Sequence, residues 1–130
     1  MGRKVKSIRP ELIDAVIDGD HATLERLLLQ GCDVDARDTA GWTALHFAAQ
    51  RQDASLIGRL LAAGASVDAP DGYGNTPLFR AVFCYRGDPS AIAALKAAGA
   101  DQTRANTHGV SPRSLADSIA NYDVTSALTA

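Results

Sequence analysis

The chain has 130 residues, 46% of them hydrophobic and 22% charged, which is the composition of one soluble globular domain. It carries 13 basic and 15 acidic residues, and four of the basic ones, with none of the acidic ones, fall within the first nine positions. The remainder thus has 9 basic against 15 acidic residues, and such an acidic body excludes nucleic acid as the expected partner.

The start of the chain and its cysteines favour a cytoplasmic protein. Residues 1–7 form a basic tail without the apolar run of a signal peptide, and Lys6 stands where a myristoylation signal needs Ser or Thr. No stretch approaches the roughly 18 apolar residues that cross a bilayer, so no membrane partner is expected. Two cysteines, Cys32 and Cys84, are too few for a disulfide framework and are expected to be free thiols.

The chain repeats itself with a period of 33 residues. The string "LLLQGCDVDA" returns 33 positions later as "LLAAGASVDA" and then, more loosely, as "KAAGADQTRA". A second string recurs as "AGWTALHFAA", "YGNTPLFRAV" and "HGVSPRSLAD". Self-similarity at such a period is the signature of a stacked repeat array. In chain order the units are residues 5–37, 38–70, 71–105 and 106–130.

Each unit is expected to hold two short helices and a hairpin loop. Leucines recur at helical spacing in "HATLERLLLQ" of the first unit and in "ASLIGRLLAA" of the second. In the third and fourth units, Thr76-Pro77 and Ser111-Pro112 place a capping hydroxyl before a proline at the first helical position. The glycines expected to end second helices or to occupy hairpin turns with positive φ are Gly31, Gly41, Gly64, Gly74, Gly99 and Gly109.

These strings resemble the ankyrin repeat, whose pattern is D-x-x-G-x-T-P-L-H-x-A-A, then a second helix ending in LL-x-x-G-A and a hairpin. Residues 38–70 match nearly throughout and 71–105 match well, whereas the first unit is degenerate and the last is truncated. The resemblance implies a single all-α domain over 1–130, a solenoid of four helix–turn–helix units joined by short hairpin loops. It also implies that the outer two units are caps, which suits Arg113 in place of a leucine and Ile8 in place of a turn glycine.

One unit is two residues longer than the others. The spacing of the recurring alanines rises from 33 to 35 residues after Ala81, and the turn glycine Gly87 locates the excess before it. Asp88 then falls just before the second helix of its unit, where a carboxylate caps free amides, with Pro89 at the first helical position. The Arg-Gly-Asp tripeptide at 86–88 is therefore interpreted as a turn and a cap, and not as an adhesion ligand.

Nothing in the sequence indicates catalysis. His21, His46 and His108 are scattered, and neither they nor the two distant cysteines have the spacing of metal ligands. The glycines follow the repeat rather than a phosphate-binding loop, and the HExxH, GxSxG and SxxK motifs are absent. We therefore expect no catalytic residue, metal, cofactor or small-molecule substrate, and a half-buried, unreactive thiol at Cys84. The resemblance assigns His46 a hydrogen bond between adjacent hairpin loops.

The resemblance places the function on a concave face, which the hairpin tips and the exposed sides of the first helices form. Trp, Tyr and Arg, the residue types enriched at binding hot spots, gather at the corresponding positions. An alternative stays open for two of them, in which Trp42 packs on its own hairpin and Phe83 faces the core. The expected partner-binding residues are Trp42, Gln50, Arg51, Tyr73, Asn75, Arg80, Phe83, Tyr85, Arg86 and His108.

Together these features predict a non-enzymatic module that engages another protein through a rigid, preformed concave face and is a monomer when free. Similarity to small free-standing bacterial ankyrin proteins, some of which are immunity proteins, implies a narrower hypothesis: an intracellular inhibitor that neutralises a toxin or effector enzyme. A general scaffold with several weak partners is the alternative.

Overall fold

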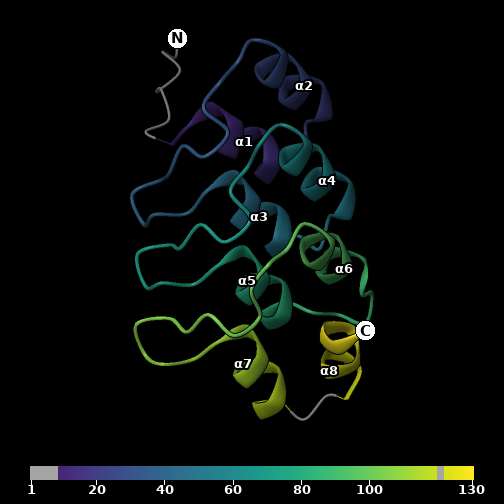
Figure 1. The fold of residues 1–130 in the computed structure, drawn as a ribbon. Helices are drawn as coiled ribbons and strands as arrows, with labels where there is room; N and C mark the ends of the chain where they lie inside the picture. The colour runs from purple at the N-terminus through teal and green to yellow at the C-terminus, as the bar shows by residue number, and fades with distance from the viewer. Residues whose placement is uncertain (1–8, 120–121) are drawn as a thin grey trace, which may run out of the picture.

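The computed structural model describes residues 9–119 and 122–130 (Figure 1). The basic tail of residues 1–7 and Ile8 lie outside the described residues. Within the described ranges every regular element is an α-helix, and loops join successive pairs of helices, so the all-α solenoid is confirmed. In chain order the helices are α1 (Glu11–Asp18), α2 (His21–Leu29), α3 (Ala44–Gln50), α4 (Ala54–Ala62), α5 (Pro77–Phe83), α6 (Ser90–Ala97), α7 (Pro112–Ser118) and α8 (Tyr122–Thr129).

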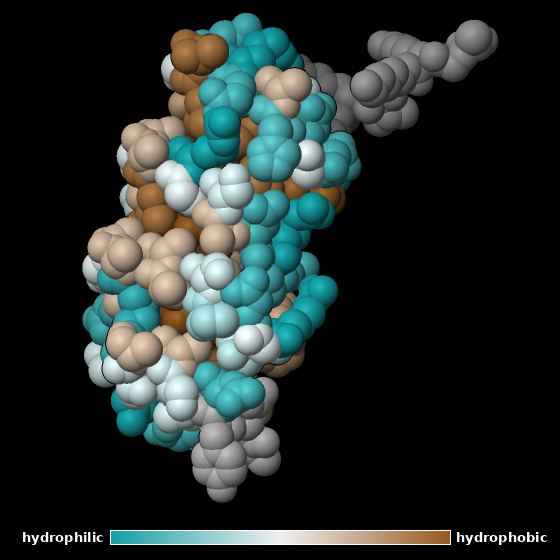
Figure 2. Space-filling model, turned by 90° about the vertical axis from the view of Figure 1, so that its right-hand side faces the viewer, coloured by the Kyte–Doolittle hydropathy of each residue, from teal (hydrophilic) through white to brown (hydrophobic). Residues whose placement is uncertain are grey.

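The helices stack in two rows (Figure 1). The odd-numbered helices form the inner row, with the hairpin loops on one side of it and the even-numbered helices, the outer row, on the other. Each inner helix packs against the next, so α3 contacts both α1 and α5, and α5 contacts both α3 and α7. Figure 2 faces the outer row, where hydrophilic residues cover much of the surface.

Alanine and leucine supply most of the core. Leu12, Leu45 and Leu78 are buried from successive units, and small side chains between them let neighbouring helices approach closely. Few aromatic side chains are needed, because the helices are close enough for methyl groups to fill the space between them. The alanines with at most 1% of their surface exposed are Ala44, Ala48, Ala49, Ala81, Ala91 and Ala116.

Hydroxyl side chains start the later inner helices, as predicted. The Thr76 hydroxyl accepts a hydrogen bond from the Phe79 amide over 3.3 Å, and the Ser111 hydroxyl accepts one from the Ser114 amide over 3.1 Å. A proline follows each of these caps at the start of the helix. Each cap satisfies one of the amide donors that a helix start leaves free.

The turns after the inner helices show where the longer unit differs. Gly19, Gln52 and Gly87 share a left-handed backbone, with φ of 66°, 58° and 103°, as equivalent turn positions require. Gln52 lacks the freedom of glycine, and its amide group donates to the Ala81 carbonyl over 2.9 Å. Since α3 and α5 both have seven residues, the two extra residues follow α5, at positions 85–86.

Asp88 stabilises the start of α6, although in a different way from the one predicted. Its carboxylate accepts hydrogen bonds from the Ser90 hydroxyl over 2.6 Å and the Ser90 amide over 2.9 Å, and these bonds lower the pKa of Asp88. The prediction that Pro89 is the first helical residue is wrong, because α6 begins at Ser90. Asp20 and Asp53 instead accept from the amide three residues further along. The carboxylate of the Arg-Gly-Asp tripeptide is thus engaged by the fold.

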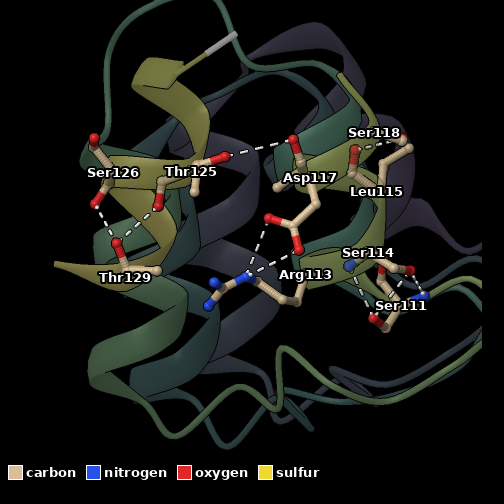
Figure 3. A network of polar contacts seen from close by, with 10 residues as sticks. Ser111, Arg113, Ser114, Leu115, Asp117, Ser118, Thr125, Ser126 and Thr129 are labelled. Carbon is tan, nitrogen blue, oxygen red and sulfur yellow. Dashed lines mark hydrogen bonds and ion pairs between the residues drawn. The ribbon is translucent and has the colours of Figure 1, made fainter. Parts of the chain in front are cut away.

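Polar side chains of the fourth unit are exposed on its surface (Figure 3). Arg113, at the repeat position of the buried Leu78, is exposed and pairs with Asp117 one turn along α7 at 3.3 Å. The Thr125 hydroxyl contacts the Ala116 carbonyl over 3.5 Å and joins α8 to α7. A polar outer surface is what the terminal unit of a stacked array needs in order to meet water.

Candidate functional site

Three hairpin loops border the inner row, and a repeated set of hydrogen bonds holds them. A side-chain oxygen at the start of each loop, from Asp38, Asp71 or Asn106, accepts from two backbone amides of the same loop. One further backbone hydrogen bond joins each loop to the next, so the three loops form one connected edge. These 2.9 Å bonds run from the Gly72 amide to the Ala40 carbonyl and from the Thr107 amide to the Tyr73 carbonyl.

His46 joins α3 to the next hairpin loop. It is fully buried, its Nε2–H donates to the Asn75 carbonyl over 2.8 Å, and its Nδ1 accepts from the Thr43 amide over 3.1 Å. The predicted hydrogen bond between adjacent units is therefore confirmed. Burial lowers the pKa of His46, so the imidazole is neutral, as an acceptor at Nδ1 requires.

The stability of the protein should fall as the pH drops below 6.5, the ordinary pKa of histidine. The unfolded chain binds a proton in this range that the folded chain excludes from His46, so unfolding becomes easier. Hydrogen bonds from neighbouring hydroxyls lower the pKa values of Asp20, Asp88 and Asp101. These carboxylates therefore change the stability of the protein only as the pH falls to their ordinary pKa of 3.8 and below. We expect a lower urea midpoint at about pH 5.5 than at about pH 7.5, and a smaller difference in His46→Gln. An equal difference in both chains would contradict the assignment to His46.

Five side chains from α3, α5 and the loop before α3 meet on the surface made by the hairpin tips and the exposed sides of α3 and α5, which we call the inner face. Arg80 places its guanidinium 4.6 Å from the Trp42 ring and 5.1 Å from the Phe83 ring, and its Nη2 donates to Gln50 Oε1 over 2.9 Å. The Trp42 ring also lies 4.7 Å from the Phe47 ring. We call these residues (Trp42, Phe47, Gln50, Arg80 and Phe83) the inner cluster. The structure thus brings four of the predicted site residues together.

Two of the three aromatic side chains of the inner cluster, Trp42 and Phe83, differ in exposure. Trp42 is half-buried and packs on its own unit, against Phe47 and the buried His46. Phe83 is 59% exposed, so the alternative in which it faces the core is wrong. Phe47 was not among the predicted site residues. Its position 33 residues before Arg80, at the same place in the repeat, is the signal that could have found it.

Two other predicted residues, Arg51 and Asn75, hold neighbouring units together. Arg51 Nη1 donates to the carbonyl of Ile17 near the end of α1 over 2.8 Å. Asn75 Oδ1 accepts from Asn106 Nδ2 over 2.8 Å, while its backbone carbonyl accepts from His46. Both side chains therefore already have partners within the fold.

Tyr73 and His108 occupy the tips of the hairpin loops. Tyr73 is 63% exposed, and His108 is exposed as well. An open depression of about 560 Å³ lies beside Tyr73, with Arg37 along its wall. Arg37 donates hydrogen bonds to the carbonyls of Gly41 and Pro70, which fixes its guanidinium between two loops. The tips therefore extend the inner face beyond the inner cluster.

Tyr85 and Arg86 lie apart from the inner cluster. Tyr85 is half-buried and lines a groove of about 790 Å³ between α6 and α8, together with Pro89, Ala93 and Ala127. Arg86 is exposed next to it. The prediction that Tyr85 lies on the concave face is wrong, because the two extra residues follow α5, where the chain crosses to the outer row.

In the part of the chain that the structure describes, the cysteines stand apart from any cluster of metal-ligating side chains. Cys32 and Cys84 are half-buried and free, and burial together with the neighbouring Asp33 carboxylate raises the pKa of Cys32. Among the described residues, no group of three or more His, Cys, Asp or Glu side chains is placed to hold a metal ion. Across residues 9–119 and 122–130, no helix has the length and apolar character needed to cross a bilayer.

Comparison with known proteins agrees with this fold. A family model described as "Ankyrin repeats (3 copies)" matches residues 12–106. Over 40 residues, or 31% of this chain, the sequence is 52% identical to ankyrin repeat domain-containing protein 46 of Danio rerio. That match spans 18% of the relative's own length. The family match covers most of the chain, and the helix pairs, caps and hairpin bonds recur with the same period, so the chain belongs to the ankyrin-repeat family.

Proposed function

We propose that the chain binds a protein partner through its inner face, the surface made by the hairpin tips and the exposed sides of α3 and α5. Ankyrin repeats are protein–protein interaction modules, and the inner cluster is the observation that carries the choice of surface. It combines three aromatic rings with an arginine, and tryptophan and arginine are among the residue types enriched at binding hot spots. Phe83 and Tyr73, both more than half exposed, extend this surface along the array.

The frame beneath this surface supports binding without rearrangement. The hairpin loops are bonded to one another, and His46, Arg51 and Asn75 join successive units. A preformed surface loses little conformational entropy on association, which favours affinity. Binding of this kind needs no chemistry, and we propose that the free chain is a monomer that acts in the cytoplasm, where free thiols such as Cys32 and Cys84 are usual.

Site-specific crosslinking tests the choice of surface. A photoreactive phenylalanine analogue at Phe83 is expected to crosslink the partner in native cells, whereas the same analogue at Leu29 should not. Leu29 is a matched control because it is 84% exposed and lies at the end of α2 in the outer row. Crosslinks from position 29 with none from position 83 would place the partner on the outer row and contradict the proposal.

Two truncations on the same face should weaken the complex without loss of fold. Phe83→Ala and Tyr73→Ala are each expected to lower affinity at least tenfold, or about 1.4 kcal/mol, because both rings are exposed and available to a partner. Their melting temperatures should stay close to that of the native chain. Trp42→Ala is a poorer test, since Trp42 also packs on Phe47 and His46. Unchanged affinity in both truncations would exclude the inner face.

The number of partners separates the two narrower hypotheses. A toxin inhibitor of the immunity type should form one tight complex of fixed stoichiometry, and a scaffold should retain several partners weakly. Mass spectrometry of the proteins crosslinked from position 83 distinguishes them. A single species that also loses enzymatic activity when bound would favour the inhibitor.

A further inference from the structure

We propose that the partner of the inner face supplies a carboxylate to Arg80 and an apolar side chain to Phe83. This inference rests on the proposed function and adds the chemistry of the partner, an acidic protein surface. Arg80 and Phe83 are neighbours on α5, with the guanidinium 5.1 Å from the ring centre. An acidic residue next to an aliphatic or aromatic residue would therefore contact both.

Arg80 carries a charge that the described part of the chain does not neutralise. No carboxylate of that part forms an ion pair with it. Its Nη2 donates to the neutral amide oxygen of Gln50, and its Nε is buried without a hydrogen-bond partner. A guanidinium has five N–H donors. Gln50 engages one of them and the buried Nε holds another, so the remaining donors on Nη1 and Nη2 are left for a partner.

Some arginines elsewhere on the molecule have carboxylate partners within the chain, although Arg86 and Arg104 form no ion pair with a described carboxylate. One ion pair joins α1 to α2, a second joins α2 to α4, and a third lies within α7. Their charges are balanced before any partner arrives, whereas that of Arg80 is not. The three pairs are Arg26–Glu11, Arg59–Glu25 and Arg113–Asp117.

The carboxylates along the hairpin edge are already engaged. Asp38 and Asp71 each accept two backbone hydrogen bonds inside their own loops. Arg37 at the same edge donates to the carbonyls of Gly41 and Pro70 and forms no ion pair with a described carboxylate. The guanidinium groups of the inner face thus complement an acidic partner, although the body of the chain is itself acidic.

The surroundings of Arg80 prepare it for a carboxylate. The ring centres of Trp42 and Phe83 lie 4.6 and 5.1 Å from the guanidinium carbon, and Gln50 accepts a hydrogen bond from one of its nitrogens. A guanidinium held in this way loses little freedom on binding, and its planar edge matches the two oxygens of a carboxylate. Arg80 is also half-buried, and its reduced contact with water strengthens a charge interaction at this position.

A random peptide library displayed on phage tests this inference without knowledge of the native partner. The full chain serves as bait, beside Arg80→Gln and the outer-row control Arg59→Gln. The native chain and the control are expected to enrich peptides with Asp or Glu next to Leu, Phe, Tyr or Trp. A synthetic peptide of that kind should bind Arg80→Gln at least about tenfold more weakly, as expected for a charge-assisted hydrogen bond. Its binding should also weaken in about 1 M salt, where charges are screened within about 3 Å.

Several outcomes would overturn the acidic partner. These are enriched peptides without acidic residues, acidic peptides that bind Arg80→Gln as tightly as the native chain, and no enrichment at all. Crosslinking from position 83 tests the proposed function separately. Partner binding by the inner face could therefore be correct even if the partner is not acidic. If Arg80→Gln does not fold, Arg80→Lys replaces it: this variant keeps the charge but not the planar fork, and binding equal to that of the native chain would overturn the inference.

Discussion

Replacement of His46 with alanine is expected to lower the free energy of unfolding by about 2–4 kcal/mol, because it removes buried hydrogen bonds and leaves a cavity. The Asn75 carbonyl would still accept from the Asp71 amide over 2.9 Å, so that end of the bridge stays satisfied. The Thr43 amide would lose its acceptor at Nδ1 in a buried site, which is the more costly loss. Urea denaturation at about pH 7.5, where the imidazole is neutral in both states, measures the difference.

His21 provides the matched control for this substitution. It is exposed at the start of α2, and His21→Ala is expected to change stability by less than about 0.5 kcal/mol. His46→Gln offers an intermediate, because a glutamine amide retains both a donor and an acceptor. If His46→Ala unfolded at the same urea concentration as His21→Ala, the bridge between α3 and the next loop would contribute no net stability, and the role assigned to His46 would be wrong.

Most of the fold could be predicted because each local sequence signal, such as a helix-ending glycine, recurs in several repeat units. One glycine is ambiguous on its own, but Gly31, Gly64 and Gly99 at the same repeat position indicate helix ends, and all three have positive φ. The start of α6 could not be placed to the residue. A carboxylate can cap an amide two or three residues further along the chain. Asp88 binds the amide two residues ahead, and which amide it binds depends on the geometry of a loop that has two extra residues.

The inner cluster could be predicted only in part. A repeat position indicates which side of a helix or loop a residue occupies, and this is enough to predict Trp42, Gln50, Arg80 and Phe83. It does not indicate where a long side chain ends, so the contact of Arg51 with α1 could not be foreseen. Tyr85 has no counterpart in the other units, and the sequence therefore gave no pattern from which to orient it.

The inner cluster belongs to two units, and this couples binding to stability. Trp42, Phe47 and Gln50 come from the second unit, while Arg80 and Phe83 come from the third. The guanidinium of Arg80 thus contacts one ring from each unit. A substitution that separates the units should therefore weaken partner binding even where it touches no residue of the cluster.

Gly41→Ala is the substitution expected to separate these units most directly. The backbone of Gly41 has φ of 84°, and an added Cβ would lie 2.8 Å from the Gly72 amide nitrogen in the next loop. That amide donates to the Ala40 carbonyl, so the methyl group would strain the backbone and break the bond that joins the loops. We expect a loss of about 2–4 kcal/mol, from backbone strain of about 1–3 kcal/mol and a hydrogen bond of about 1 kcal/mol. Urea denaturation of the purified variant measures it.

Gly31→Ala is the control that separates backbone strain from the steric clash expected in Gly41→Ala. Gly31 also has a positive φ, 75°, but a Cβ there would meet no atom within 4 Å. Its substitution should therefore cost only the left-handed backbone, about 1–2 kcal/mol, less what alanine removes from the entropy of the unfolded chain. The excess loss in Gly41→Ala then measures how firmly adjacent loops are held at their observed separation. Equal losses would mean that the loops move apart freely, and the rigidity on which binding by the inner face depends would be absent.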